Sequence, residues 1–284
     1  MNRPIRTYSW YDGRTLTLGK KTQIMGIMNV SPEYLSYGGN KWNTIDKALY
    51  HTAEMAREGA DIIDLGVESP NPIGGIPISA EREIARLIPI LEHLIQEVPV
   101  PIAIDTYKFE TAMLALELGV HILNDVFGLQ YDREPGKMAQ VAADYNVPII
   151  LVHNQQGSEY GEDLIWDISR YFAKSVEIAH KAGVDRDKII LDPGFDFGKT
   201  PAQSLMILSR LEQLTTLPYP MMIGPSHKPF LQKILDLPQD DITEGIGAAC
   251  VIGIMKGADI VRVHDIKKIS QMARITDAIT MKGL

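Results

Sequence analysis

The sequence predicts an α/β fold, a (β/α)8 barrel of the TIM type preceded by an N-terminal hairpin. Three observations predict this fold. Short apolar segments recur along the chain, a stretch with helical spacing of apolar residues follows each of them, and no Pro-, Gly- or Ser-rich linker divides them. The pattern favours a closed barrel over an open doubly wound sheet. We therefore expect a single domain over 1–284, with the hairpin at 1–21 and the barrel at 22–284.

The predicted hairpin comes before the first strand of the barrel. Residues 8–19 place Asp12-Gly13 between two short runs, which is typical of a tight hairpin turn. Because this segment lies outside the first βα unit, we expect it to plug the bottom of the barrel.

The predicted strands are too short for typical helices and are apolar on both faces, as parallel strands covered by helices should be. They cover residues 22–28, 61–66, 101–105, 121–125, 148–153, 188–192, 220–224 and 259–263.

The predicted helices alternate with these strands. One begins at an N-cap, Thr44, and stops at Gly59, and the next begins at Ser79 with Glu83 in a near capping-box pattern. The remaining helices are expected within 108–119, 133–146, 163–183, 201–214, 228–237, 241–258 and 266–280.

Composition excludes several classes of function. The net charge of -8 and the pI near 5.4 argue against a nucleic-acid or anionic-membrane surface, and they leave small phosphate-containing molecules allowed. The single Cys250 excludes an intramolecular disulfide and a thiolate metal site. With no signal-like start and no apolar run long enough for a membrane span, we expect a cytoplasmic protein that does not bind a membrane.

Polar residues end the predicted strands. In a barrel these ends converge on the face that carries active sites. A turn or cap role is open for any one of them, as for Asp192 before Pro193-Gly194, but caps need no Lys, Arg and His as well. The set is Asn29, Glu68, Asp105, Asn124, Asp125, His153, Asn154, Asp192, Ser226, Lys228, Arg262 and His264.

The chemistry of these side chains divides in two. One group offers acceptors and donors suited to a planar heterocycle whose amino-amide edge can pair two N–H groups with one carboxylate, and it comprises Asp105, Asn124, Asp192 and Lys228. The other group, Asn29, Arg262 and His264, suits an anion such as a phosphate, with or without a metal. Arg262 alternates with its apolar strand neighbours and should line the barrel mouth; a structural ion pair inside the barrel is the alternative.

The motifs at the strand ends resemble those of the dihydropteroate synthase family from about Thr22 to the C-terminus. The similar segments are IMGIMNVSPEYLSYGG (24–39), GADIIDLGVES (59–69), IDTYK (104–108), NDVFG (124–128), VHN (152–154), LDPGFDFGKT (191–200), GPSHK (224–228) and VRVHDI (261–266). The resemblance implies a (β/α)8 barrel, usually a homodimer, that uses Mg²⁺ to condense 6-hydroxymethyl-7,8-dihydropterin diphosphate with 4-aminobenzoate in folate biosynthesis.

The resemblance also implies roles for individual residues. Asp105, Asn124, Asp192 and Lys228 would bind the pterin. Asn29 would bind the metal and the diphosphate, and Arg262 and His264 would bind the diphosphate. Asn29, Lys228, Arg262 and His264 would form the catalytic set, and loss of diphosphate followed by attack of the arylamine would require no protein nucleophile.

The loops depart from the family pattern. Pro70 and Asn71 stand where the family has Thr and Arg, and His227 and Pro229 stand where it has Arg and Ser. The first loop, at 31–37, also differs. Since neither Asn nor His replaces the planar, always-charged guanidinium, the use of 4-aminobenzoate is open.

Three hypotheses follow from these departures. The first is a synthase with divergent loops. The second is a pterin-binding paralogue with another second substrate or none, for which turnover with 4-aminobenzoate would be weak or absent. The third is the pterin-binding module of a corrinoid methyltransferase system, which would need a partner protein.

Overall fold

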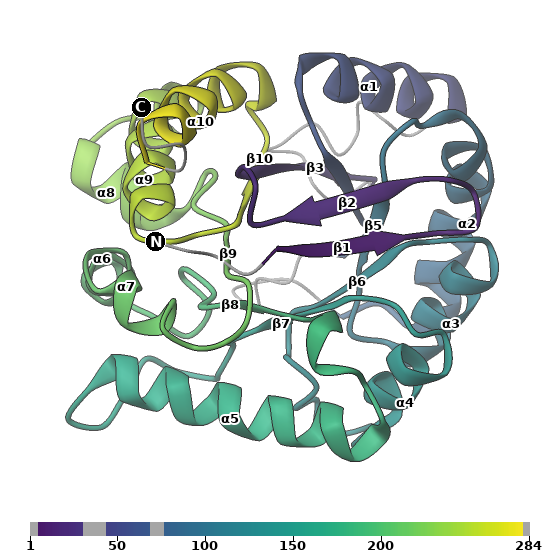
Figure 1. Cartoon of the computed structure of the whole chain (residues 1–284), viewed down its shortest axis with the longest axis horizontal. Helices are drawn as coiled ribbons and strands as arrows, with labels where there is room; N and C mark the ends of the chain where they lie inside the picture. Colours follow the sequence, from purple (N-terminus) through teal and green to yellow (C-terminus); the bar gives the residue numbers. More distant parts are fainter. Residues whose placement is uncertain (1–4, 31–43, 69–76, 281–284) are drawn as a thin grey trace.

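Eight parallel strands form a central barrel in the computed structural model, which describes residues 5–30, 44–68 and 77–280 (Figure 1). The strands are β3 (Gln23–Asn29), β4 (Ile62–Gly66), β5 (Ile102–Asp105), β6 (Ile122–Asp125), β7 (Ile149–Val152), β8 (Ile189–Asp192), β9 (Met222–Ile223) and β10 (Ile260–Val263). Their order is β8-β7-β6-β5-β4-β3-β10-β9, and a parallel bridge between Leu191 and Met221 joins the two ends. The predicted (β/α)8 barrel is confirmed.

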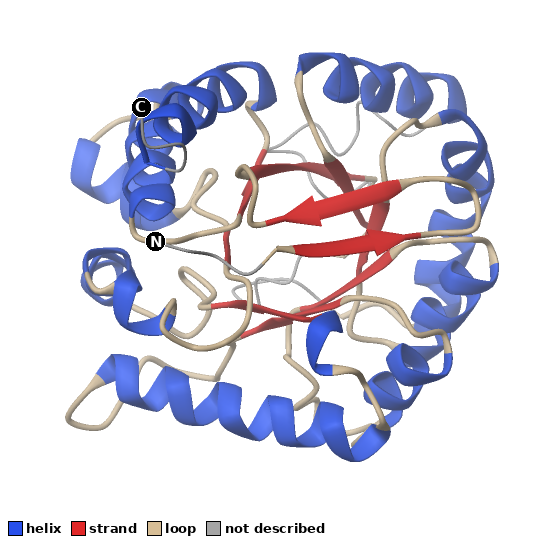
Figure 2. Ribbon diagram, in the orientation of Figure 1, coloured by secondary structure: helices blue, strands red, loops and turns tan. Residues whose placement is uncertain are grey.

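Helices surround the strands as an outer ring (Figure 2). They are α1 (Ile45–Glu58), α2 (Ala80–Glu97), α3 (Phe109–Glu117), α4 (Lys137–Asp144), α5 (Leu164–Ala182), α6 (Pro201–Ser209), α7 (Leu211–Leu214), α8 (Pro229–Leu235), α9 (Thr243–Met255) and α10 (Ile266–Thr280), with 3-10 turns η1 (Arg186–Lys188) and η2 (Gln239–Asp241). The Thr44 and Ser79 side chains accept the predicted N-cap hydrogen bonds, and Gly59 ends α1 in the left-handed conformation.

Two predicted helices differ from the observed ones. The helix expected from residue 133 begins only at Lys137, because Gly136 has a left-handed φ of 79° and cannot continue a helix. The helix expected over 201–214 is divided into α6 and α7 at Arg210, whose φ of -116° lies outside the helical range.

The barrel interior is built in layers, since alternate residues of each strand face inward. The lower layer is apolar and consists of Met25, Ile62, Ala103, Ile122, Ile150, Ile190, Met222 and Ile260. Two residues further along, five of these eight strands carry polar inward side chains, Asp64, Asp105, Asn124, Asp192 and Arg262, and the other three carry Ile27, Val152 and Gly224. The polar layer therefore sits directly above an apolar floor.

The N-terminal hairpin closes the opposite end of the barrel, as predicted. Strands β1 (Arg6–Ser9) and β2 (Thr15–Leu18) pair antiparallel and cross the barrel end in Figure 1. Tyr8, Leu16 and Leu18 pack against the apolar floor. The floor is therefore covered on the side away from the polar layer.

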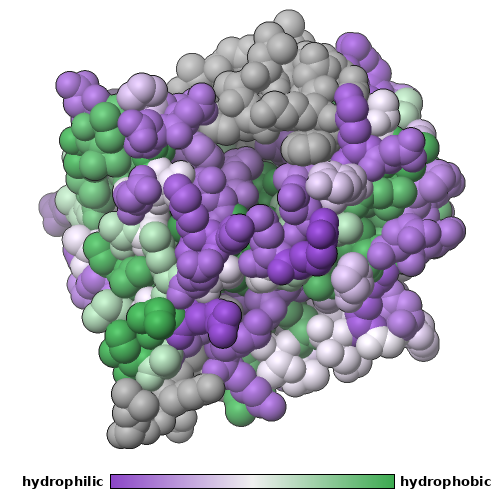
Figure 3. Space-filling model, turned by 90° about the horizontal axis from the view of Figure 1, so that it is seen from above, coloured by the Kyte–Doolittle hydropathy of each residue, from purple (hydrophilic) through white to green (hydrophobic). Residues whose placement is uncertain are grey.

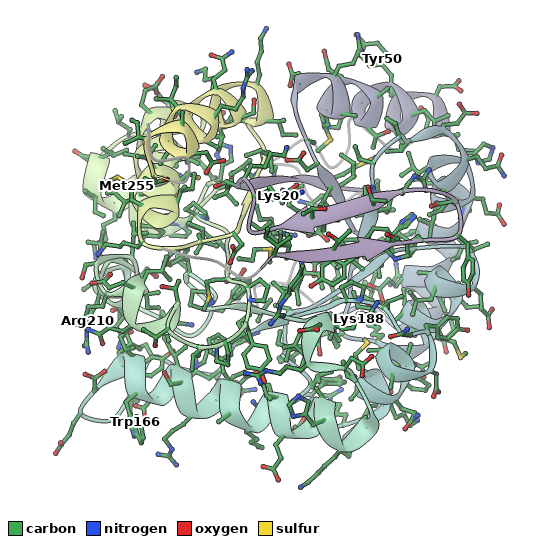
Figure 4. The ribbon with its side chains drawn as sticks, in the orientation of Figure 1. Lys20, Tyr50, Trp166, Lys188, Arg210 and Met255 are labelled. Carbon is green, nitrogen blue, oxygen red and sulfur yellow. The ribbon has the colours of Figure 1, made fainter. Side chains whose placement is uncertain are left out.

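The outer surface includes an apolar region over α8–α10. Exposed apolar side chains gather over α8–α10, on the left of Figure 3, where Met255 projects outward in Figure 4. Elsewhere Tyr50 and Trp166 point away from the barrel as single residues. In the described ranges, no helix combines the length and apolarity needed to cross a membrane.

The hairpin contact gives a stability prediction. Leu18 is fully buried against the floor, so Leu18→Ala should lower the free energy of unfolding by about 2 to 5 kcal/mol through lost burial and a cavity. Tyr11→Ala is the matched control, because Tyr11 is fully exposed at the turn of the same hairpin and should change stability by less than about 0.5 kcal/mol. Urea unfolding measures both; equal midpoints for the two variants would contradict the plug.

Candidate functional site

A narrow cavity opens at the carboxyl ends of the strands. Its polar lining is Asp105, Asn124, Asp192, Lys228 and Arg262, and its apolar walls are Val126, Val152, Phe195, Phe197 and Met222. The structure thus brings together all four residues predicted to bind a heterocycle, with one of those predicted to bind an anion. Apolar walls with a few convergent polar groups are typical of a small-molecule site.

Arg262 joins two carboxylates at the cavity. Its Nε donates to Asp64 Oδ2 at 2.5 Å, and its NH2 donates to Asp105 Oδ2 at 2.7 Å. Burial disfavours the guanidinium charge, but the two carboxylates outweigh it and raise the pKa of Arg262 above its ordinary value. Arg262 faces the barrel mouth as predicted, and it also makes the internal ion pair that was the alternative.

The pocket carboxylates are strongly desolvated. Burial raises the pKa of Asp105, against the lowering effect of Arg262 and with a further increase from Asp64. Burial likewise raises the pKa of Asp192 to about 6, although the Gly194 N–H donates to Asp192 Oδ1 at 2.7 Å. Both groups are therefore poised to exchange hydrogen bonds or a proton with a ligand near neutral pH.

The turn after β8 shows that Asp192 is both a turn residue and a cavity residue, the two roles that its sequence position allowed. Its Oδ1 holds the turn by accepting from Gly194, while the residue lines the cavity. Gly194 has a φ of 66°, and a Cβ there would lie 2.2 Å from the His153 carbonyl oxygen. Only glycine lets the two loops approach so closely, and the turn leaves the second oxygen of Asp192 for a ligand.

Lys228 completes the polar lining from the start of α8. Its Nζ lies 4.2 Å from the centroid of the Phe197 ring, a cation-π contact that fixes the ammonium group beside an apolar wall. Burial lowers the pKa of Lys228, against the raising effect of Asp196. Pro229 occupies the first turn of α8, where a missing N–H costs nothing.

Asn29 and His264 lie beside the cavity and do not line it. Asn29 ends β3 and is paired in register with Gly66 of β4. A Cβ placed on Gly66 would lie 3.4 Å from Asn29 Oδ1 and also 3.4 Å from the Cβ of Asp105, so these two side chains flank Gly66. His264 Nδ1 lies 2.9 Å from Ser226 Oγ. Burial lowers the pKa of His264 to about 3, so the ring is neutral at pH 7 and can offer an anion a hydrogen bond but no charge.

His227 takes part in loop packing. Its Nδ1 lies 3.0 Å from the Gln239 carbonyl oxygen, the Gln239 amide donates back to the His227 carbonyl at 3.0 Å, and its Nε2 lies 3.5 Å from Asp265 Oδ2. The side chain therefore ties the loop after β9 to the loop after β10 and is absent from the cavity lining. Pro70 and Asn71 lie outside the described residues.

Several other polar residues at the strand ends have structural partners. Asp125 accepts from the backbone N–H groups of Phe127 and Leu129 at 2.9 and 2.7 Å, as a turn residue does. His153 contacts the Lys199 ammonium group through Nδ1 at 2.8 Å, and burial together with Lys199 lowers its pKa to about 2. For these residues the structural reading is correct.

Sequence reasoning missed Asp64. This residue is 0% exposed in the middle of β4, accepts from Arg262, and accepts from Asn124 Nδ2 at 3.0 Å. The sequence did contain a signal for Asp64: a carboxylate stands between Ile63 and Leu65 inside an apolar strand, and a buried charge requires a partner.

A metal site made only of protein groups is not found in the described part of the chain, where no three His, Cys, Asp or Glu residues cluster suitably. Asn29 Oδ1, which lies close to Gly66 and Asp105, is an oxygen of the kind that a hard cation accepts as a ligand.

Comparisons with known proteins agree with this geometry. The family described as pterin binding enzyme matches residues 25–264. The dihydropteroate synthase of Bacillus subtilis is 46% identical over 268 residues, which cover 94% of this chain and 92% of that protein.

Two solved structures are similar throughout. A Clostridium difficile dihydropteroate synthase crystallised in the presence of pteroic acid has a TM-score of 0.88 at 44% identity, covering 93% of this chain and 99% of that one. A Xanthomonas albilineans dihydropteroate synthase with 4-aminobenzoic acid has a TM-score of 0.87 at 31% identity, covering 95% and 97%.

Asp192 gives a prediction for the pH dependence of stability. Since its pKa is about 6 in the folded chain and about 4 in the unfolded chain, the unfolded state ionises first as the pH rises. The free energy of unfolding should therefore fall by about 3 kcal/mol between about pH 4 and pH 6 in the wild type relative to Asp192→Asn. Urea unfolding of both proteins across this window measures the difference.

Asp163 is the control, because its contribution to stability should change with pH in the opposite direction. A hydrogen bond from Arg210 lowers the pKa of Asp163, the exposed N-cap of α5, so its stabilising effect is lost as the pH falls through the folded-state pKa. The stability difference between wild type and Asp163→Asn should grow with rising pH. A pH-independent difference for Asp192→Asn would show that burial does not perturb this carboxyl.

Proposed function

This chain belongs to the dihydropteroate synthase family, and from that premise we propose which of its residues bind each part of the substrates. It is a transferase of folate biosynthesis that joins a dihydropterin to 4-aminobenzoate. The proposals below concern the residues, the leaving group, the metal and the assembly.

The pterin is proposed to occupy the cavity between Asp105, Asn124, Asp192 and Lys228. The observation that carries this assignment is Asn124 Oδ1, a buried acceptor that has no hydrogen-bond partner among the described residues. The edge of a pterin presents an amino group and ring N–H groups, which can donate to this oxygen and to the second oxygen of Asp192. The planar ring would lie against apolar walls such as Phe197.

The diphosphate is proposed to bind at Asn29, Arg262 and His264. Arg262 uses Nε and NH2 for its carboxylates, so NH1 remains for the anion. His264 would bind as a neutral ring, since burial lowers its pKa to about 3. Because the cavity already holds paired carboxylates, these groups alone supply little excess positive charge to an anion.

Mg²⁺ fits this arrangement as a partner of Asn29. Magnesium in proteins commonly takes one or two protein oxygens and completes its shell with substrate phosphates and water, which suits a single amide oxygen at the rim. When bound, the ion would neutralise charge on the departing diphosphate.

The reaction would then proceed without a protein nucleophile. The bond between the pterin methylene carbon and the diphosphate oxygen breaks, the arylamine nitrogen forms a bond to that carbon, and the amine loses a proton. Asp192 and Asn124 hold the ring, and Arg262 and His264 meet the leaving group. Preorganised donors aimed at developing charge are the main contribution that such a site makes.

The two other hypotheses drawn from the loops have less support. A paralogue that had lost its second substrate was suggested partly by His227, yet this side chain binds Gln239 and Asp265 outside the cavity. The corrinoid-linked reading has no relative in its favour among those described above, whereas synthases match along most of the chain.

A homodimer is proposed from the apolar surface over α8–α10 (Figure 3). The exposed apolar side chains there are Ile234, Leu235, Leu237, Ile252, Met255, Ile275 and Ile279. Gathered apolar residues of this kind mark protein-protein contacts. We also propose a cytoplasmic location, since a substrate carrying a diphosphate is too highly charged to cross a bilayer unaided.

Pterin binding is tested with Asp192→Asn. The substitution replaces an acceptor by an amide that turns a donor toward the ring N–H groups, so affinity for a pterin should fall by about 2 to 4 kcal/mol. Calorimetry with wild type and variant measures this. Equal affinities would reject the placement of the pterin at Asp192.

Catalysis is tested by following dihydropteroate formation from the dihydropterin diphosphate and 4-aminobenzoate. Wild-type protein should turn over with Mg²⁺ and should slow by about two to three powers of ten when the metal is chelated. His227→Arg is the matched variant and should leave the rate within about threefold, because the His227 side chain does not line the cavity. An inactive wild type beside an active Asn71→Arg, His227→Arg variant would instead establish the paralogue.

A further inference from the structure

Asp64 lies at the centre of the polar layer and has no assigned role in the reaction. It is 0% exposed and stands in the middle of β4 between Ile63 and Leu65, whose side chains belong to the outer core. By strand alternation its side chain faces the barrel interior, directly above Ile62 of the apolar floor.

One oxygen of Asp64 holds two residues of the proposed binding set. Oδ2 accepts from Arg262 Nε at 2.5 Å and from Asn124 Nδ2 at 3.0 Å. Arg262 in turn donates to Asp105 at 2.7 Å, so three cavity residues are linked through Asp64. The four residues come from β4, β5, β6 and β10, so this hydrogen-bond network, called the tie below, connects four strands at the barrel mouth.

The tie determines which way the Asn124 amide points. An ionised carboxylate only accepts hydrogen bonds, so Asp64 must face the NH2 end of Asn124. The carbonyl end, Oδ1, is thereby turned away and is left as a buried acceptor without a partner among the described residues. Asn124 consequently presents an acceptor to a ligand that brings N–H donors.

Stability alone is a poor explanation for this arrangement. Burying an ion pair in place of apolar residues is often neutral or unfavourable for folding, and here two carboxylates share one guanidinium. The cluster is thus costly to bury, and what it provides is a fixed orientation of the Asn124 amide and of Arg262.

We propose that Asp64 is a positioning residue of the pterin site: it orients the Asn124 amide as an acceptor and holds Arg262 at the mouth. This inference rests on the function proposed above. Asp64 itself does not touch the pterin; it acts through Asn124 and Arg262.

A second consequence concerns Asp105. The charged groups that face Asp105 are Arg262, Asp64, Glu83 and Lys228, and among them Asp64 opposes its ionisation. Removing the charge of Asp64 leaves Arg262 with Asp105 as its one carboxylate partner, so Asp105 should ionise at lower pH. The acidic limit of pterin binding should shift to lower pH in Asp64→Asn, which a purely structural role for Asp64 would not produce.

The test compares Asp64→Asn with Asp125→Asn. Asp125 is an equally buried carboxylate in the adjoining part of the barrel, but its oxygens accept from backbone N–H groups on the outer side of β6. Calorimetry with a pterin should show affinity about 30-fold weaker for Asp64→Asn, the loss expected for a misdirected buried acceptor. Asp125→Asn should bind within about twofold of wild type while losing thermal stability.

Each outcome decides the question. If Asp64→Asn binds as tightly as wild type while Asp192→Asn is weakened, the inference is overturned and the pterin site stands. If wild-type protein does not bind a pterin, the proposed function fails first.

A second variant covers the case in which Asp64→Asn does not fold. Asp64→Glu keeps the charge and the acceptor, but its extra methylene displaces Arg262 and Asn124, and affinity should fall by about tenfold. A folded Asp64→Glu with wild-type affinity would equally overturn the inference.

Discussion

Alternation of side chains along closed parallel strands is the constraint on which the site depends. Because every second residue faces the interior, an apolar floor at residues such as Ile62 and Ile122 requires that Asp64 and Asn124 stand in the next layer. There the Asn124 amide donates to Asp64 past the intervening strand β5. The hairpin then seals the floor from below through Tyr8 and Leu18. The polar layer therefore has one open side, and that side is the cavity.

The carboxylates of the polar layer keep hydrogen-bond acceptor atoms that a ligand can use. Asp64 and Asp105 both accept hydrogen bonds from Arg262, and one oxygen of Asp192 accepts from the Gly194 N–H in the turn. Burial raises the pKa values of Asp105 and Asp192, which means that water has already been removed from groups that still have acceptor capacity. A heterocycle with several N–H donors would satisfy such groups better than solvent does in a narrow space, and this would be the physical basis of the proposed pterin binding.

The same alternation separates functional from structural residues among neighbours in sequence. Asn124 and Asp125 are adjacent, yet one lines the cavity and the other caps a turn on the outer side. Val152 lines the cavity while His153 packs against the rings of Tyr171 and Phe172 on α5. Adjacent polar residues at a strand end thus differ in role because they face opposite sides of the sheet.

The sequence by itself determined the fold and much of the site. The short apolar strands, the helix ends at Thr44 and Gly59, and the placement of Asp105 and Asp192 at strand ends all follow from local periodicity and turn chemistry. Strand periodicity left open which of Asn124 and Asp125 faces inward, because strands that are apolar on both faces do not show which face is the interior one. The motif resemblance indicated Asn124, and only the tertiary structure placed it in the cavity lining. The tertiary structure also decided the turn of His227 toward Gln239. It decided the pairing of Asp64 with Arg262 as well, because these residues are 198 positions apart in the chain and meet only when the barrel closes.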